Sequence, residues 1–167
     1  MFSEILSQII TGLEQARENG LLQAYALIGG FAVSAWGVSR ATQDIDLAVV
    51  LGTSEPRTLA AYLSATYEAG DTDDSLQGVF HLTIEHKGLG VPVQLIVLRP
   101  KWTDVVFREI ETLTVLGCAV PVVNWHALVL MKIYAGGPVD LQDARSIVAV
   151  RNPGVEDRKR LIAQAAS

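Results

Sequence analysis

The order of apolar and polar positions predicts a chain in which strands come first and helices gather at the end. Runs typical of strands lie at 22–28, 44–51, 79–85, 91–98 and 112–116. Helical spacing of apolar residues predicts an N-terminal helix ending near Asn19, short helices at 31–36, from Pro56 and at 102–109, and three more after Asn124. This order is typical of an α+β fold with a mixed β-sheet flanked by helices. We expect one domain over 1–167, with a helical tail at about 124–167.

The clearest alternation lies in the segment 79–85, which pairs with 91–98 across a turn at Lys87–Gly90 to form a hairpin. One side of the first strand carries Val79, His81, Thr83 and Glu85, and the other carries Phe80, Leu82 and Ile84. The acidic stretch from Glu68 to Ser75 before it is expected to be a solvated loop. The three histidines share no spacing that indicates a metal site, so we interpret them as incidental.

Two carboxylates stand out at the start of an apolar strand. Asp44 and Asp46 are two positions apart in a run whose other members, to Val50, are apolar. On a strand this spacing places both side chains on one face of the sheet. Two neighbouring negative charges repel each other, and a divalent ion such as Mg²⁺ or Mn²⁺ prefers oxygen ligands of this kind. The alternative is an exposed strand edge with two solvated acids.

Just upstream, Gly29 and Gly30 end one apolar run and open a predicted helix. Bare backbone N–H groups at this position are suited to binding phosphate, although glycine at such a junction is also explained by a purely structural tight turn. Arg40 and Thr42 precede the aspartates and could donate hydrogen bonds to phosphate oxygens. For Arg40, an ordinary surface cation is the alternative interpretation.

The order of strand, Gly29-Gly30, short helix and Thr42-Gln43-Asp44-Ile45-Asp46-Leu47 resembles the polymerase-beta-type nucleotidyltransferase superfamily. The branch it resembles is the small prokaryotic one that includes abortive-infection toxin nucleotidyltransferases, and the resemblance runs from about Leu27 to Asp143. It implies that Asp44 and Asp46 bind Mg²⁺ and that a nucleotide is transferred from a nucleoside triphosphate to an acceptor, which could be RNA, a protein or a small molecule. It also implies toxin–antitoxin biology, with a cognate antitoxin as a candidate partner and a homodimer as a candidate assembly.

The third carboxylate of that superfamily lies on a later strand, and the matching position here holds Gln94. Its neighbours Val93 and Leu95 are apolar, so alternation directs Gln94 to the opposite face, toward the two aspartates. An amide can offer a metal its oxygen but cannot act as a general base. Glu85 on the partner strand is one candidate to replace the missing acid. A catalytically inactive nucleotide-binding or interaction module of the same fold is the alternative to an active enzyme.

Lys132 is the only residue with a formal charge between Gly117 and Val139, on an otherwise apolar helix. Burying its ammonium group without a partner would be costly, so we expect it to reach water or to pair with Asp140 or Asp143 beyond the Gly136-Gly137-Pro138 break. The run Asp140-Leu141-Gln142-Asp143 resembles a late motif of the toxin-like branch, which implies that Lys132 and Asp143 line the active site. An acid early in a helix is also favoured without any function.

Composition narrows the remaining possibilities. Half of the residues are hydrophobic and 19% are charged, which excludes a disordered chain. The net charge of −5 argues against strong nonspecific binding to nucleic acid and suits a cationic acceptor, such as the substrate of an aminoglycoside nucleotidyltransferase. The single Cys118 fits a reducing, cytoplasmic location. The uncharged stretch 19–39 is interrupted by glycine and polar residues, so no membrane span is expected.

Overall fold

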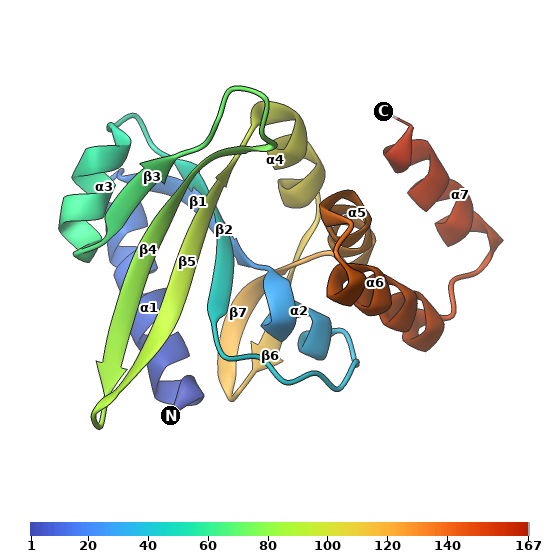
Figure 1. Cartoon of the computed structure of the whole chain (residues 1–167), viewed down its shortest axis with the longest axis horizontal. Coiled ribbons are helices and arrows are strands. Elements are labelled where there is room, and N and C mark those ends of the chain that lie inside the picture. Colours follow the sequence, from blue (N-terminus) through green and yellow to red (C-terminus); the bar gives the residue numbers. More distant parts are fainter. Residues whose placement is uncertain (167) are drawn as a thin grey trace.

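The fold is built around one mixed β-sheet with helices on both of its faces (Figure 1). The computed structural model describes residues 1–166. The strands are β1 (Leu22–Leu27), β2 (Ile45–Leu51), β3 (Thr66–Ala69), β4 (Leu76–His86), β5 (Leu89–Leu98), β6 (Ile110–Val115) and β7 (Cys118–Val123). They lie in the order β3-β4-β5-β2-β1-β7-β6; β2 pairs with β5 in parallel, as β1 does with β7, and the other neighbours are antiparallel. The predicted α+β class with a mixed sheet is confirmed.

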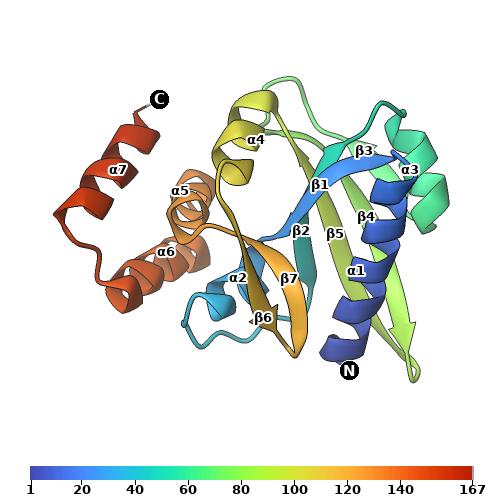
Figure 2. The same cartoon turned by 180° about the vertical axis from the view of Figure 1, so that it is seen from behind.

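The helices divide between the two faces of this sheet. They are α1 (Phe2–Glu18), α2 (Gly29–Ala35), α3 (Pro56–Leu63), α4 (Pro100–Phe107), α5 (Trp125–Ala135), α6 (Pro138–Arg151) and α7 (Val155–Ala165). Figure 2 shows α1 lying across one face. On that face Leu47, Leu95 and Phe80 form a row across three strands, and each is fully buried. The apolar half of the alternation at 79–85 therefore faces the core.

The opposite face is covered only in part. Figure 1 shows α2 and the C-terminal helices on the side of β1, β2 and β7, whereas β4 and β5 have no helix in front of them. The outward residues of β4, such as His81, Thr83 and Glu85, are exposed. The β4 end of this face thus exposes polar side chains that no helix covers.

Three details of the prediction are wrong. The predicted acidic loop starts two residues too early, because Glu68 and Ala69 are the last residues of β3, which pairs with β4. The apolar residues after the turn at Gly117 form β7, which the sequence interpretation left unassigned. Asp44 lies just before β2 rather than within it. No helix among residues 1–166 is both long enough and apolar enough to cross a membrane.

Candidate active site

Asp46 lies near the start of β2, with its carboxylate against the backbone of Gly29 at the start of α2. Gly29 has a φ of +65°, a region that residues with a side chain rarely adopt. A Cβ atom built on Gly29 would collide with Asp46 Oδ2 and lie 2.9 Å from Asp46 Cγ. The glycine is therefore required both by its backbone conformation and by the close approach of the carboxylate.

Asp44 joins this carboxylate from the loop before β2. Thr42 Oγ1 donates a hydrogen bond to Asp44 Oδ1 over 2.9 Å, which fixes the side chain without help from strand geometry. The pKa of Asp46 is raised to about 6, mainly by burial and also by the nearby charge of Asp44. The charges of Lys132 and Arg40 oppose this shift. The two acids interact as the sequence predicted. Asp44, however, is positioned by the loop before β2 and its hydrogen bond from Thr42, and not by the strand itself.

Lys132 reaches the site because two helices form a hairpin. Gly136 ends α5 in a left-handed conformation with a φ of +69°, and Pro138 starts α6 on the return path. The buried Lys132 Nζ lies 2.7 Å from Asp140 Oδ1 and 3.0 Å from Asp143 Oδ2. The predicted pairing of Lys132 is thus confirmed with both aspartates.

Arg40 connects this hairpin to the loop that carries the aspartates. Its Nη1 lies 3.0 Å from Asp143 Oδ2, so the buried Asp143 carboxylate sits between two cations. A Cβ atom on Gly30 would lie 2.7 Å from Thr42 Oγ1 and 3.0 Å from Arg40 Nη1. Gly30, Arg40 and Thr42, which were expected to bind phosphate, therefore pack against one another.

Aromatic contacts hold α6 and α5 against α2. The Arg151 guanidinium near the end of α6 lies 5.2 Å from the centroid of the Trp36 ring and 6.0 Å from that of Trp125. Trp36 Nε1 in turn donates a hydrogen bond to the carbonyl oxygen of Val123 over 2.9 Å. This cluster fixes the helices that carry Lys132 to the sheet that carries Asp46.

Gln94 lies beside Asp46. The parallel pairing of β2 with β5 makes Asp46 and Gln94 direct partners, so their side chains leave the same face of the sheet, as the alternation predicted. Glu85 is a partner of Gly90, four positions from Gln94 along β5, which corresponds to a separation of about 13 Å along the strand. The register therefore argues against Glu85 as the replacement for the missing acid.

His81 is the neighbour that the sequence interpretation missed. It is the antiparallel partner of Gln94 on β4, so Asp46, Gln94 and His81 form a row across three adjacent strands on one face. His81 Nε2 also lies 3.5 Å from Glu68 Oε2 on β3. The signal was present in the alternation, which put His81 on the polar side of its strand, but the order of the strands could not be read from the sequence.

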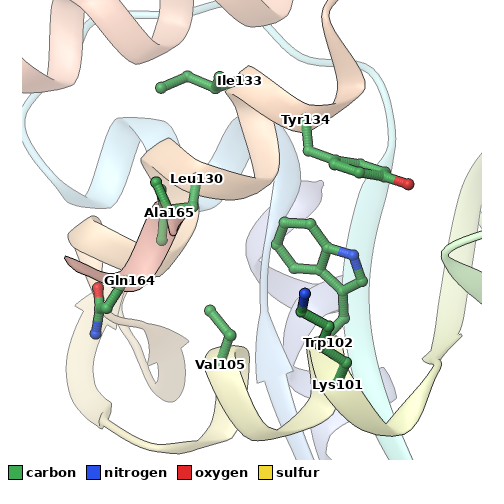
Figure 3. Close-up of a pocket in the computed structure, with 8 residues that line it drawn as sticks. All are labelled: Lys101, Trp102, Val105, Leu130, Ile133, Tyr134, Gln164 and Ala165. Atoms are coloured by element: carbon green, nitrogen blue, oxygen red, sulfur yellow. The ribbon is translucent and has the colours of Figure 1, made fainter. Parts of the chain in front are cut away.

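A separate pocket of about 370 Å³ lies between α4, α5 and α7 (Figure 3). Trp102 and Tyr134 face each other across it, edge to face, with 4.9 Å between ring centroids. None of the residues predicted from the sequence to form the site lines this pocket. Within residues 1–166 no group of three or more His, Cys, Asp or Glu side chains could hold a metal ion, so the candidate site offers two carboxylates and the Gln94 amide.

Comparison with known proteins identifies the fold. No protein-family model matches the sequence, and no curated protein matches it significantly. The solution structure of the antibiotic-resistance factor ANT(2″)-Ia matches with a TM-score of 0.59 and 19% identity, covering 98% of this chain and 91% of that one. The crystal structure of ANT(2″)-Ia in complex with adenylyl-2″-tobramycin matches with a TM-score of 0.57 and 20% identity, covering 98% of this chain and 97% of that one. The crystal structure of an antigenic nucleotidyltransferase-like protein from Paracoccidioides brasiliensis matches with a TM-score of 0.53 and 18% identity, covering 95% of this chain and 85% of that one. The chain therefore has a polymerase-beta-type nucleotidyltransferase fold.

Proposed function

We propose that this chain is a divalent-metal-dependent nucleotidyltransferase that moves a nucleotide from a nucleoside triphosphate to an acceptor. The observation that carries the proposal is the convergence of opposite charges at one point of the fold. The Asp46 carboxylate lies against the backbone of Gly29, and the charges of Lys132 and Arg40 both act on it from other elements. Bringing these groups together from four separate segments has no evident purpose in stability alone.

The residues at this point fit a hard cation. Asp44 and Asp46 supply carboxylate oxygens, and Gln94 can add an amide oxygen from the neighbouring strand. Burial is the main cause of the raised pKa of Asp46, and the charge of Asp44 is the second. A cation bound between the two acids would stabilise their charged forms and so oppose both effects. Mg²⁺ or Mn²⁺ bound here would neutralise phosphate charge and stabilise the leaving pyrophosphate.

The remaining residues have roles that follow from their contacts. Lys132 and Arg40 supply positive charge beside the carboxylates. Gly29 and Gly30 let Asp46, Thr42 and Arg40 approach the start of α2 closely, which gathers the groups that would bind the metal and the phosphates. Asp143 holds Lys132 and Arg40 in place through its ion pairs of 3.0 Å with each. Rate enhancement in such a site comes from positioning and electrostatics.

The net charge of the protein indicates which class of acceptor it can bind. The protein carries a net charge of −5, which disfavours a polyanionic acceptor and favours a cationic one. The structural neighbour ANT(2″)-Ia was crystallised in complex with adenylyl-2″-tobramycin, a small molecule that carries an adenylyl group, which supports a small-molecule acceptor. The toxin-like branch, a cognate antitoxin and a homodimer remain predictions of the sequence.

Gln94 favours a second candidate function, a catalytically inactive nucleotide-binding or interaction module. With two carboxylates and a neutral amide, the site has less negative charge for a metal than three carboxylates would give, and the amide cannot accept a proton. Such a module would bind a nucleoside triphosphate in the presence of the metal and release no pyrophosphate.

One titration separates these functions. The protein is titrated with each of the four nucleoside triphosphates, with and without Mg²⁺, while binding is measured by calorimetry and pyrophosphate release by a coupled assay. Metal-dependent binding that disappears in the Asp44→Asn/Asp46→Asn variant, together with pyrophosphate release, supports the enzyme. Binding without release supports the module, and binding that the double variant retains contradicts the site itself.

A further inference from the structure

We propose that the free edge of β4 binds an extended peptide segment of a partner protein, with apolar side chains at alternate positions and a Lys or Arg between two of them. The peptide would add a strand to the sheet and place its apolar side chains in the groove between α1, α3 and β4. None of the residues proposed for nucleotidyl transfer lines this groove, so the inference is independent of that function.

The edge is free because β3 is much shorter than β4. The four residues of β3 pair with Gly78 to His81, and the chain enters β3 from α3. Leu82 to His86 therefore pair only with β5. Figure 1 shows this end of β4, marked by its arrowhead, with no strand on its outer side. The free segment is about 16 Å long, which is enough for a short peptide strand.

The hairpin turn between β4 and β5 sets the hydrogen-bonding pattern of the segment. Lys87 and Gly88 have φ values of +52° and +80°, as in the two-residue turns that favour hairpins. Such a turn makes the residues that flank it, His86 and Leu89, a hydrogen-bonded pair. Hydrogen-bonded and non-hydrogen-bonded pairs then alternate along the two antiparallel strands.

This alternation decides which backbone groups face the free edge. Leu82 and Ile84 form hydrogen-bonded pairs with β5, whereas Thr83 and Glu85 turn their N–H and C=O groups away from it. Pro92, which has no N–H group, lies opposite Thr83, as the pattern requires. Within residues 1–166 the outward groups of Thr83 and Glu85 have no hydrogen-bond partner. They form a template for a further strand.

Beside this edge lies a groove of about 950 Å³ with an apolar floor. Leu82 and Ile84 line it from β4, and each is only 9% exposed. Ile9 of α1 and Leu63 of α3 line it from the helices. A strand paired with this segment would direct every second side chain to the face of Leu82 and Ile84, where the groove can bury it. The groove thus selects apolar residues at alternate positions of the peptide.

Charge favours a basic peptide over a second copy of the chain. Within residues 1–166 the groove is lined by two acids, Glu4 and Glu85, and by no Lys or Arg. Glu4 is paired with the terminal ammonium group of Met1 over 2.6 Å, whereas Glu85 is exposed and has no ion pair. A second copy paired antiparallel about Ile84 would bring its own Glu85 to within about 8 Å, where like charges repel. A Lys or Arg opposite Glu85 would instead be attracted.

The segment also lacks the features that keep edge strands from pairing. Such strands commonly carry Lys, Pro or a bulge. Residues 82–86 read Leu-Thr-Ile-Glu-His, without Lys or Pro, and their register with β5 is regular. The irregularity of that ladder lies at its other end, between Leu76 and Gly78. These features favour an edge that pairs with another chain over one that avoids pairing.

The test uses a fluorescently labelled peptide, Thr-Val-Lys-Val-Thr-Val, designed to pair antiparallel with its lysine opposite Glu85 and its second threonine opposite Thr83. Binding is measured by fluorescence anisotropy. One derivative is N-methylated on the lysine and the second threonine, whose N–H groups would face β4. The other is N-methylated on the first and second valines, whose N–H groups would face away. We expect the first derivative to bind at least about tenfold more weakly than the second, because it loses two hydrogen bonds.

A charge exchange tests the register. Glu85→Lys should weaken binding of the lysine peptide about threefold and should strengthen, by a similar factor, binding of a peptide with glutamate in place of lysine. Asp73→Lys, a matched change in the loop before the other end of β4, should alter neither affinity. Affinities that Glu85→Lys leaves unchanged would place the peptide elsewhere and refute the proposal.

Amide hydrogen exchange, followed by NMR, locates the bound peptide. In the free protein the amides of Thr83 and Glu85 should exchange fast and those of Leu82 and Ile84 slowly, and the peptide should protect the first pair. Protection that grows with protein concentration without any peptide would identify a second copy at the edge and overturn the proposal. Equal affinity of the two methylated peptides, or no binding of the parent peptide at millimolar concentration, would also overturn it. No nucleotide is used, so these outcomes leave the proposed function as it stands.

Discussion

Asp46→Asn is expected to make the metal-free protein more stable while it removes the metal site. In the folded protein, burial and the charge of Asp44 raise the pKa of Asp46 from 3.8 to about 6. A group whose pKa is raised on folding binds its proton more tightly in the native state, so ionising it destabilises that state. Each pKa unit corresponds to about 1.4 kcal/mol, so the two-unit shift corresponds to about 3 kcal/mol at pH 8. Asparagine has nearly the same shape and no charge, and it removes this penalty.

The sign of the pH dependence follows from the same shift. The penalty is absent below about pH 4, where Asp46 is protonated in both states, and is complete above about pH 6. The wild type should therefore lose stability relative to Asp46→Asn as the pH rises through this window. At pH 8 the variant should unfold at a temperature about 5–10 °C higher, given the usual response of a chain of this size.

The assay is thermal unfolding in chelator at several pH values, with Asp73→Asn as the control because Asp73 is an exposed acid in the loop after β3. Both proteins share every other titrating group, such as His126, whose pKa is lowered mainly by burial. The contributions of these groups therefore cancel in the difference between the unfolding temperatures of variant and wild type. Mg²⁺ should raise the unfolding temperature of the wild type and leave that of Asp46→Asn unchanged. A variant that is no more stable than the wild type at pH 8, or a gap that does not close toward pH 4, would refute the reasoning.

Three further predictions concern the rest of the site. Gly30→Ala should weaken Mg²⁺-nucleotide binding at least tenfold in calorimetry, because its Cβ would lie 2.7 Å from a threonine oxygen, whereas Gly154→Ala, with nothing within 4 Å, should not. Lys132→Met should lower the free energy of unfolding in urea by about 3 kcal/mol, since it leaves buried carboxylate charge short of a partner. Adding Asp143→Asn should recover part of that loss, and a double variant no better than the single one would contradict the pairing. Gln94→Asp should tighten Mg²⁺ binding about tenfold by adding a third negative charge beside Asp46, and unchanged affinity would place Gln94 outside the site.

Much of the fold was visible in the sequence because side-chain burial follows local periodicity. The strict alternation at 79–85 predicted β4, and Phe80, Leu82 and Ile84 are buried as it required. Lys132 could be paired from the sequence because a lone charge on an apolar helix must find a partner close by. These inferences needed only the spacing of residues within one or two neighbouring elements.

The errors come from features that depend on distant partners. The residues of β3 are polar enough to resemble the loop that follows them, and only pairing with β4 makes them a strand. β7 contains Pro121, which weakens a strand signal, and it is held between β1 and β6. The position of His81 beside Gln94 was hidden for the same reason, because it depends on which strands are neighbours in space.

The ion pairs of Asp143 have a consequence for protein synthesis. Asp44 and Asp46 emerge from the ribosome before Lys132 and Asp143, which are made about 90 and 100 residues later. Arg40 gains its partner only when α6 has folded back onto the sheet. A translation product interrupted before Asn124 would hold the acids but neither the lysine nor the helices that bring it to them. The candidate site is therefore assembled only after α5 and α6 have been made, and a shorter chain has its carboxylates without Lys132.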